Sequence, residues 1–248
     1  MEAQSAPTIR LSLLRGFELR VRQRPVPLLW SAQRVVAFLA LKDKPLGRSY
    51  VAGVLWPETT SSRANANLRS SLWRAQRSCR QLITASAQHL ALAPRVAVDV
   101  RSALVNAQLL LVGAATTPED FGAGIRSDLA AELLPDWYDD WVLVEQERYR
   151  QLRLHALEAM CDRLTAAGRH GEAIDAGLAA VSAEPLRESA HRALIKAHLA
   201  EGNHWEAVRQ YEMYRRLLFD ELGLKPSPAL RALVPGPLLG PVGPAAPR

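Results

Sequence analysis

The sequence contains little cysteine and no long apolar run. Its two cysteines among 248 residues, Cys79 and Cys161, are too few and too far apart for a disulfide framework or a zinc cage, so we expect buried free thiols. No stretch of about 18 or more uncharged apolar residues occurs, which argues against a membrane span. The N-terminus MEAQSAPTIR also lacks the apolar core of a signal peptide. We therefore expect a cytoplasmic protein.

The signatures of common enzymes are missing as well. The chain has no GxSxG nucleophile elbow, no HExxH zinc motif and no glycine-rich phosphate loop, and without GxxxxGK[ST] it is not expected to use ATP for control. His191, His198 and His204 could be drawn as a metal site, but no cysteine or acid cluster joins them. The acids Asp139 and Asp140 are adjacent, so on a helix they point in different directions. We expect neither an enzyme nor a bound metal or cofactor.

Charge is divided unevenly between the two halves of the chain. Residues 1–112 hold 16 Arg and Lys against 5 Asp and Glu, a net of +11, whereas residues 113–248 hold 15 against 20, a net of −5. A basic half joined to an acidic half suggests that only the first half meets a polyanion.

The order of elements expected in the first half is that of a winged helix. Residues 8–29 alternate apolar and polar side chains, as in short strands of a small antiparallel sheet. Three helices follow, at 32–41 behind a Ser31 cap, at 49–55, and at 63–80 behind a Ser62 cap. Residues 82–84, 90–92 and 95–100 then read as strands of a wing hairpin. A small sheet, three helices and a hairpin are the outline of a winged helix-turn-helix.

The third of these helices carries the most specific signal. At about 100° per residue, one stripe presents arginines and polar side chains while the opposite side is apolar. Arginine can bond bidentately to guanine, asparagine to adenine, and both can hold phosphates. The alternative is a solvated arginine face on an ordinary amphipathic helix. The stripe consists of Arg63, Asn67, Ser70, Arg74 and Arg77, with Arg69, Trp73 and Arg80 on its flank.

The acidic half contains an internal repeat. Gly168, His170, Glu172 and Ala173 recur 34 residues later as Gly202, His204, Glu206 and Ala207, which is the period of tetratricopeptide repeats. One helix pair cannot bury its apolar face alone, so neighbouring pairs stack. Around the repeat we expect a short helix at 101–111, another that begins at Thr117-Pro118, and a long helix from Pro135 to Ala167. The Pro- and Gly-rich tail at 235–248 is expected to be disordered.

Several runs resemble a known family. The runs LPDWYDDWV at 134–142, EQERYRQLRLHALE at 145–158, EPLRESAH at 184–191 and the segment 211–226 resemble the bacterial transcriptional activator domain. The runs LWP at 55–57 and ANLRSSLWR at 66–74 resemble an OmpR-type winged helix. Together they are similar to the SARP antibiotic regulators in their short two-domain form. The resemblance covers roughly residues 8–234.

This resemblance implies a fold and a function. The fold is mainly α with a small β component, with a winged helix-turn-helix domain at 8–100 followed by an all-α, tetratricopeptide-like repeat domain at 101–234. Members activate clustered biosynthetic genes, often for antibiotics. They bind direct repeats near the −35 region as dimers and recruit RNA polymerase holoenzyme, including region 4 of its sigma factor. A member would be nucleoid-associated when bound to its promoter.

The resemblance also assigns roles to residues. The third helix becomes the recognition helix, and the loop before it faces RNA polymerase. The repeat domain supports dimerisation. The DNA-binding set is Arg63, Asn67, Arg69, Ser70, Trp73, Arg74 and Arg77, with His89 in the wing, and the polymerase-contacting loop is Trp56, Pro57, Glu58, Thr59, Thr60 and Ser61.

The sequence departs from the family pattern at two places, and it leaves two other functions possible. The third helix continues as Arg74-Ala-Gln-Arg77 rather than a Leu-Arg-Arg-like run, and the wing lacks a glycine at its tip. A helical-repeat adaptor that no longer binds DNA is one alternative, and a repressor is another. The persistence of the arginine stripe argues against the adaptor.

Overall fold

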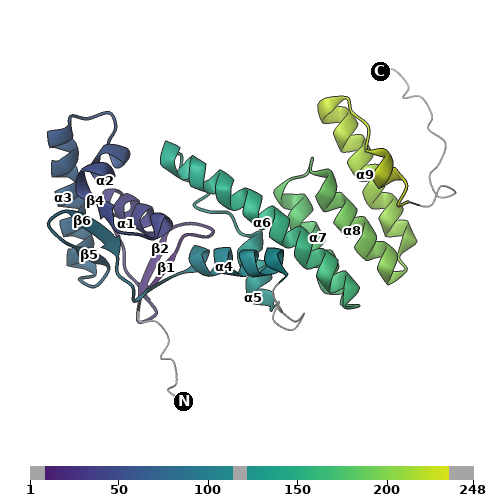
Figure 1. Ribbon diagram of the computed structural model, residues 1–248, viewed down its shortest axis with the longest axis horizontal. Helices are drawn as coiled ribbons and strands as arrows, with labels where there is room; N and C mark the ends of the chain where they lie inside the picture. Colours follow the sequence, from purple (N-terminus) through teal and green to yellow (C-terminus); the bar gives the residue numbers. More distant parts are fainter. Residues whose placement is uncertain (1–8, 114–121, 235–248) are drawn as a thin grey trace, which may run out of the picture. The chain divides into compact units, whose positions relative to one another are not determined.

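The computed structural model describes residues 9–113 and 122–234, and it forms two compact units. Unit 1 comprises Met1–Val105 and Ala131–Tyr149, and unit 2 comprises Asn106–Ala130 and Arg150–Arg248. Figure 1 shows the order of the elements along the chain. Within the described ranges, no helix is both long enough and apolar enough to cross a membrane. The helix expected to begin at Thr117 and the tail at 235–248 lie outside the described residues.

A four-stranded sheet opens unit 1. Its order is β3 (Arg24–Pro25), β2 (Glu18–Val21), β1 (Ile9–Ser12) and β7 (Val96–Val98). Strand β1 is antiparallel to β2 but parallel to β7, with Ile9 opposite Val96. The prediction that residues 95–100 belong to the wing, and that the first sheet is wholly antiparallel, was therefore wrong. Two parallel strands must be joined by a long crossover connection, which here includes the three helices. The local alternation of apolar and polar residues cannot reveal which distant strand pairs with β1.

Three helices and a second sheet complete the winged helix. They are α1 (Trp30–Lys42), α2 (Arg48–Leu55) and α3 (Ser61–Ser78), with the sheet order β4 (Leu46–Gly47), β6 (His89–Leu92) and β5 (Ile83–Ala85). The winged-helix prediction is confirmed, but both predicted caps are wrong. Leu29 occupies the cap position of α1 without a side-chain bond, and Thr60, not Ser62, caps α3.

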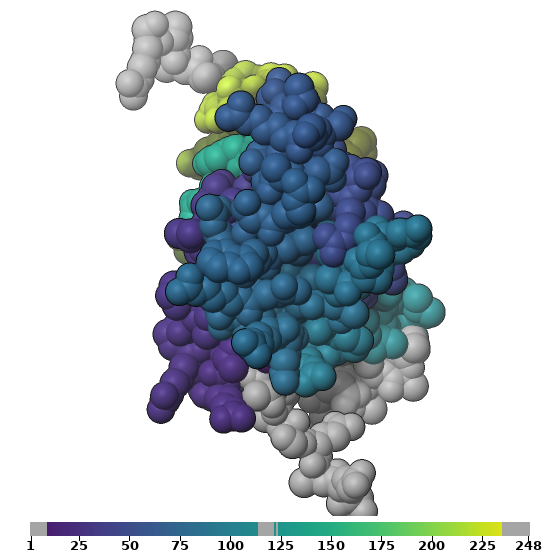
Figure 2. All heavy atoms as spheres, turned by 90° about the vertical axis from the view of Figure 1, so that its left-hand side faces the viewer, coloured from purple at the N-terminus to yellow at the C-terminus, as the bar shows by residue number. Residues whose placement is uncertain are grey.

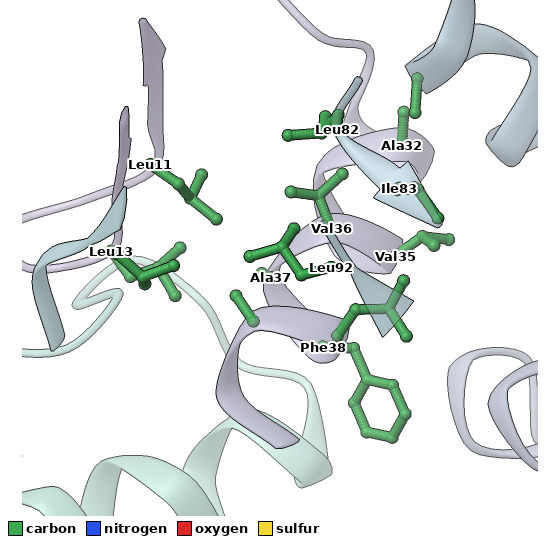
Figure 3. Close-up of a cluster of buried hydrophobic side chains, with 14 of the residues drawn as sticks. Leu11, Leu13, Ala32, Val35, Val36, Ala37, Phe38, Leu82, Ile83 and Leu92 are labelled. Carbon is green, nitrogen blue, oxygen red and sulfur yellow. The ribbon is translucent and has the colours of Figure 1, made fainter. Parts of the chain in front are cut away.

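Helix α1 lies at the centre of unit 1. Its residues Ala32 and Val35 to Ala40 are fully buried. Figure 3 shows Leu11 of β1 and Leu13, just after that strand, pointing towards one side of α1, with Ile83 of β5 and Leu92 of β6 close to it. A helix that is apolar on all sides must be covered on all sides, so α1 fixes the places of the sheets and of α3.

The segment Ala131–Tyr149 packs on the winged helix rather than on the repeats. The backbone N–H of Leu134 donates to the carbonyl of Leu13 at 2.9 Å, and that of Arg15 donates to Glu132 at 2.8 Å. Trp137 is buried, with its ring 4.4 Å from that of Trp30. The prediction of Trp137 as a core residue is confirmed, but its assignment to the second domain was wrong. The sequence pattern did not indicate that residues 131–149 pack back onto the first unit.

Two ion pairs join this acidic segment to α1. Residues 131–149 contain six acids and one arginine. Asp139 pairs with Arg34 at 2.5 Å and Glu145 pairs with Lys42 at 2.6 Å, all four side chains being largely shielded from solvent. Part of the positive charge of the first half is therefore neutralised on the side of α1 that faces this segment.

The remaining helices are mostly those of the repeat unit. They are α4 (Asp99–Val112), α5 (Ala123–Ala130), α6 (Asp140–Ala166), α7 (His170–Ala183), α8 (Glu188–Glu201), α9 (His204–Leu222) and α10 (Pro228–Arg231), and α4 and α6 contribute residues to both units. The long helix begins at Asp140, not at Pro135 as predicted, because residues 135 and 136 form a turn and residues 137–139 have no regular secondary structure.

The 34-residue repeat is confirmed by equivalent turns. Gly168 and Gly202 both adopt a left-handed backbone, with φ of 73° and 86°. After each glycine, a backbone N–H closes the end of the preceding helix. Arg169 donates to the carbonyl of Leu164 at 2.9 Å, and Asn203 donates to that of His198 at 2.8 Å. Glycine takes the left-handed conformation without strain, which explains why both turns keep it.

Close packing of small residues holds α6, α7 and α8 together. A Cβ atom at Gly177 would lie 3.1 Å from Leu194 and 3.3 Å from the Cys161 sulfur. Burial raises the pKa of the Cys161 thiol to about 12, so it remains protonated. The prediction of two buried free thiols is confirmed for both Cys79 and Cys161.

The histidines considered as metal ligands have separate environments. His191 is buried and stacks on Tyr214 at 4.2 Å, with Nε2 2.9 Å from the Pro185 carbonyl and Nδ1 2.8 Å from the Gln210 amide. Burial lowers the pKa of His191, which favours the neutral ring. His204 is exposed at the start of α9. Among the described residues, no group of three or more histidine, cysteine or acidic side chains is placed to hold a metal ion.

We predict that Trp137→Ala lowers the free energy of unfolding of unit 1 by about 3–5 kcal/mol, because it removes a large buried aromatic side chain. Denaturant unfolding would measure the change. Trp205→Ala is the matched control, since its side chain is 68% exposed and its loss should leave stability nearly unchanged. Equal stability of the two variants would contradict the buried role of Trp137.

Candidate nucleic-acid interface

One side of α3 is anchored in the core of unit 1. Ala64, Leu68, Ser71, Leu72 and Ala75 are buried, and α3 packs against both α1 and α2. The Thr60 hydroxyl accepts a bond from the backbone N–H of Arg63 at 3.4 Å and so begins the helix. The opposite side of α3 is therefore held towards solvent in a defined orientation.

The exposed side of α3 carries the predicted stripe. Arg63, Ser70, Arg74 and Arg77 are exposed and Asn67 is half-buried, so the structure brings all five stripe residues to one side of the helix. The flanking Arg69 and Trp73 are also exposed. Figure 2 looks onto this side of unit 1, with the blue atoms of α3 in front. No aspartate or glutamate occurs in Ser61–Ser78, so the stripe presents positive charge without local neutralisation.

Two of the arginines have contacts that orient them. The Arg77 guanidinium lies 5.3 Å from the centre of the Trp73 ring, and Arg74 Nη1 donates to the Ser31 hydroxyl at 3.2 Å. Arg69, Ser70, Trp73 and Arg74 line a shallow hollow on the helix surface. Exposed contacts of this kind cost little to break, so the guanidiniums remain available to a ligand.

The wing is a short hairpin of β5 and β6. Its turn is closed by the Ser86 hydroxyl, which accepts bonds from the N–H groups of Gln88 and His89 at 3.3 and 3.0 Å. His89 is exposed as the first residue of β6, just after the tip of the turn. Arg48, at the start of α2, donates from Nε to the Ser86 carbonyl at 3.0 Å and from its backbone to Gln88. Sequence reasoning missed Arg48, because its contact spans 38 residues.

The loop before α3 divides into packed and exposed residues. Trp56 is half-buried, with the Arg34 guanidinium 5.8 Å from its ring, and the Thr59 hydroxyl donates to the Trp56 carbonyl at 3.1 Å. Thr60 caps α3 and Ser61 is its first residue. Pro57 and Glu58 are exposed and make no cap or core contact. Of the six loop residues, Pro57 and Glu58 are the exposed ones that neither cap α3 nor belong to it.

Comparison with known proteins identifies the second half of the chain. Residues 126–235 match the bacterial transcriptional activator domain. This match begins in α5 and includes Ala131–Tyr149, the segment that packs on the winged helix in unit 1. Part of the matched domain thus packs with the winged helix rather than with the repeats.

Two relatives are regulatory proteins of Streptomyces. The regulatory protein AfsR of Streptomyces griseus is 30% identical over 204 residues, which is 75% of this chain and 20% of that protein. The regulatory protein AfsR of Streptomyces coelicolor is 38% identical over 89 residues, which is 36% of this chain and 9% of that protein. The chain therefore spans a fifth or less of the length of these relatives.

A solved structure has a similar fold. Mycobacterium tuberculosis EmbR, determined in complex with a low-affinity phosphopeptide, superimposes with a TM-score of 0.68 at 22% identity, over 91% of this chain and 64% of that one. The resemblance to SARP-type regulators is thereby confirmed in its architecture and relatives: a winged helix precedes a matched bacterial transcriptional activator domain, two relatives are regulatory proteins, and EmbR shares the fold.

We predict that Thr60→Ala destabilises unit 1 by about 1 kcal/mol, because α3 loses its side-chain cap. Ser62→Ala, which alters the residue that the sequence alone suggested, should change stability much less. Denaturant midpoints of the two variants provide the comparison. A larger loss for Ser62→Ala than for Thr60→Ala would contradict the cap that the structure shows.

Proposed function

We propose that this chain is a non-enzymatic transcriptional activator that binds direct repeats near the −35 region of biosynthetic promoters, such as those of antibiotic clusters. The observation that carries the proposal is the exposed stripe of α3. It places three arginines and an asparagine at helical spacing opposite a side that is buried in the core. A regulator needs such a helix, rigidly mounted and basic, to read DNA.

The dimensions and chemistry of α3 suit the major groove. Its 18 residues extend about 27 Å, and the groove, about 12 Å wide, admits a helix. Arg74 and Arg77 can each bond a guanine edge bidentately and Asn67 an adenine edge. Arg63, Arg69, Ser70 and Trp73 lie where the helix meets the phosphate backbone, and His89 in the wing can reach the adjacent backbone or minor groove.

The polymerase contact is proposed for the loop before α3. Pro57 and Glu58 are exposed, whereas their neighbours Trp56 and Thr60 support the fold. An exposed acid beside a DNA-bound helix can meet a basic surface of sigma region 4. The repeat unit is proposed to support the homodimer and further contacts with RNA polymerase holoenzyme, as expected from the transcriptional activator domain that it largely contains.

We predict that Arg74→Ala and Arg77→Ala each weaken binding to the promoter DNA by about 1–3 kcal/mol, the value of a bidentate base contact. Their unfolding transitions should match that of the unaltered chain, because both side chains are exposed. Fluorescence anisotropy with promoter DNA from the neighbouring genes measures the affinity. Arg216→Ala, which removes an exposed arginine of α9, controls for net charge. Both variants binding as tightly as the unaltered chain would reject the stripe as the recognition surface.

Glu58→Ala is expected to separate transcription from DNA binding. The change removes an exposed charge without touching a cap or core residue, so promoter affinity should be retained. In a reconstituted transcription assay, the yield should fall because the polymerase contact is weakened. Parallel losses of affinity and transcript would instead assign the loop to DNA binding.

A further inference from the structure

An arginine-lined hollow lies beyond the C-terminal end of α3, within unit 1. It is open to solvent and encloses about 860 Å³. Its walls come from the hairpin of β2 and β3 and from the turn that follows α3. Its lining includes the arginines Arg22, Arg24 and Arg80, together with Ser78 and Gln81. No acidic residue lines it.

The three arginines gather without an acidic partner. Arg22, Arg24 and Arg80 are exposed, and within the described part of the chain none of them is paired with a carboxylate. A further cation is close by, since Arg95 Nη1 donates to the side chain of Gln81 at 2.9 Å. Like charges held around one concave surface repel each other, so the arrangement favours an anion that would neutralise them.

The hairpin that carries Arg22 is held in a strained backbone. Val21 pairs with Arg24, so Arg22 and Gln23 form a two-residue turn, and both have positive φ, of 49° and 66°. Turns of this kind favour Asn-Gly, because those residues adopt the left-handed region most readily. Neither side chain packs in the core. A strained turn that keeps an arginine at its tip, where Asn-Gly would be more stable, points to a use for that charge.

We infer that this hollow, which we call the arginine hollow, binds phosphates of the DNA backbone next to the groove that α3 reads; the inference rests on the proposed function. Helix α3 ends at Ser78, and Ser78 to Gln81 line the hollow, so the hollow begins where the helix that carries the stripe ends. In Figure 2 the purple N-terminal strands expose atoms on the same face as the blue α3. A DNA strand whose phosphate backbone passes the C-terminal end of α3 would meet this surface next. Such contacts fix the register of the protein on DNA without reading sequence.

The salt dependence of DNA binding tests this inference directly. The full chain is titrated onto a mixed-sequence fluorescent duplex at a series of salt concentrations, and log K is plotted against log salt. Each phosphate contact contributes about 0.9 to the slope. The double variant Arg22→Asn with Gln23→Gly removes one cation while giving the turn its preferred residues, so its unfolding midpoint should not fall. This variant, and separately Arg24→Gln and Arg80→Gln, should each flatten the slope by about 0.9.

Controls separate the arginine hollow from general charge and from free anions. Arg10→Gln removes an exposed arginine of β1 that does not line the hollow, and its slope should match that of the unaltered chain. Unchanged slopes in all three hollow variants would overturn the inference, as would an equal effect of Arg10→Gln. Stabilisation of the unaltered chain by inorganic phosphate at constant ionic strength, with unchanged DNA slopes, would overturn it too, because the hollow would then hold a free anion. Absence of DNA binding by the unaltered chain would instead refute the proposed function itself.

Discussion

The burial of α1 on all sides is the constraint on which the structure of unit 1 depends. Ala32 and Val35 to Ala40 have no exposed surface, so two sheets, α2, α3 and Ala131–Tyr149 must all find places around one apolar helix. Apolar burial contributes about 25 cal/mol for each Å² removed from water, so these contacts dominate the stability of the unit. The orientation of α3 follows from them. Its arginine stripe is exposed because its alanine and leucine side is needed against α1 and α2.

The packing of Ala131–Tyr149 on the winged helix changes how the two halves of the chain are understood. Residues matched to the transcriptional activator domain supply Trp137 and Trp141 to the core of unit 1, and their acids pair with Arg34 and Lys42. These ion pairs neutralise two cations of α1, whereas the arginines of α3 have no carboxylate from this segment beside them. The basic and acidic halves are thus not simply a DNA-binding half and a protein-binding half.

The sequence predicted the structure correctly where the pattern involves residues close together in the chain. Helical periodicity located α3 and its exposed arginines, and the 34-residue period located the glycine turns at Gly168 and Gly202. It failed where partners lie far apart in the chain. The parallel pairing of β7 with β1, the return of Trp137 to the first unit and the contact of Arg48 with the wing all depend on residues dozens of positions away. The cap of α3 was misplaced by two residues, because Thr60, Ser61 and Ser62 are all residues that cap helices well.

A footprint on promoter DNA upstream of the neighbouring genes, at low and at high salt, tests the central claim most directly. If the α3 stripe lies in the major groove, the folded chain protects a direct repeat beside the −35 element, with its halves one helical turn or a multiple apart, and protection weakens steeply as salt rises. Absence of protection at low salt by correctly folded protein would contradict the account and leave the helical repeats as the working part of the molecule.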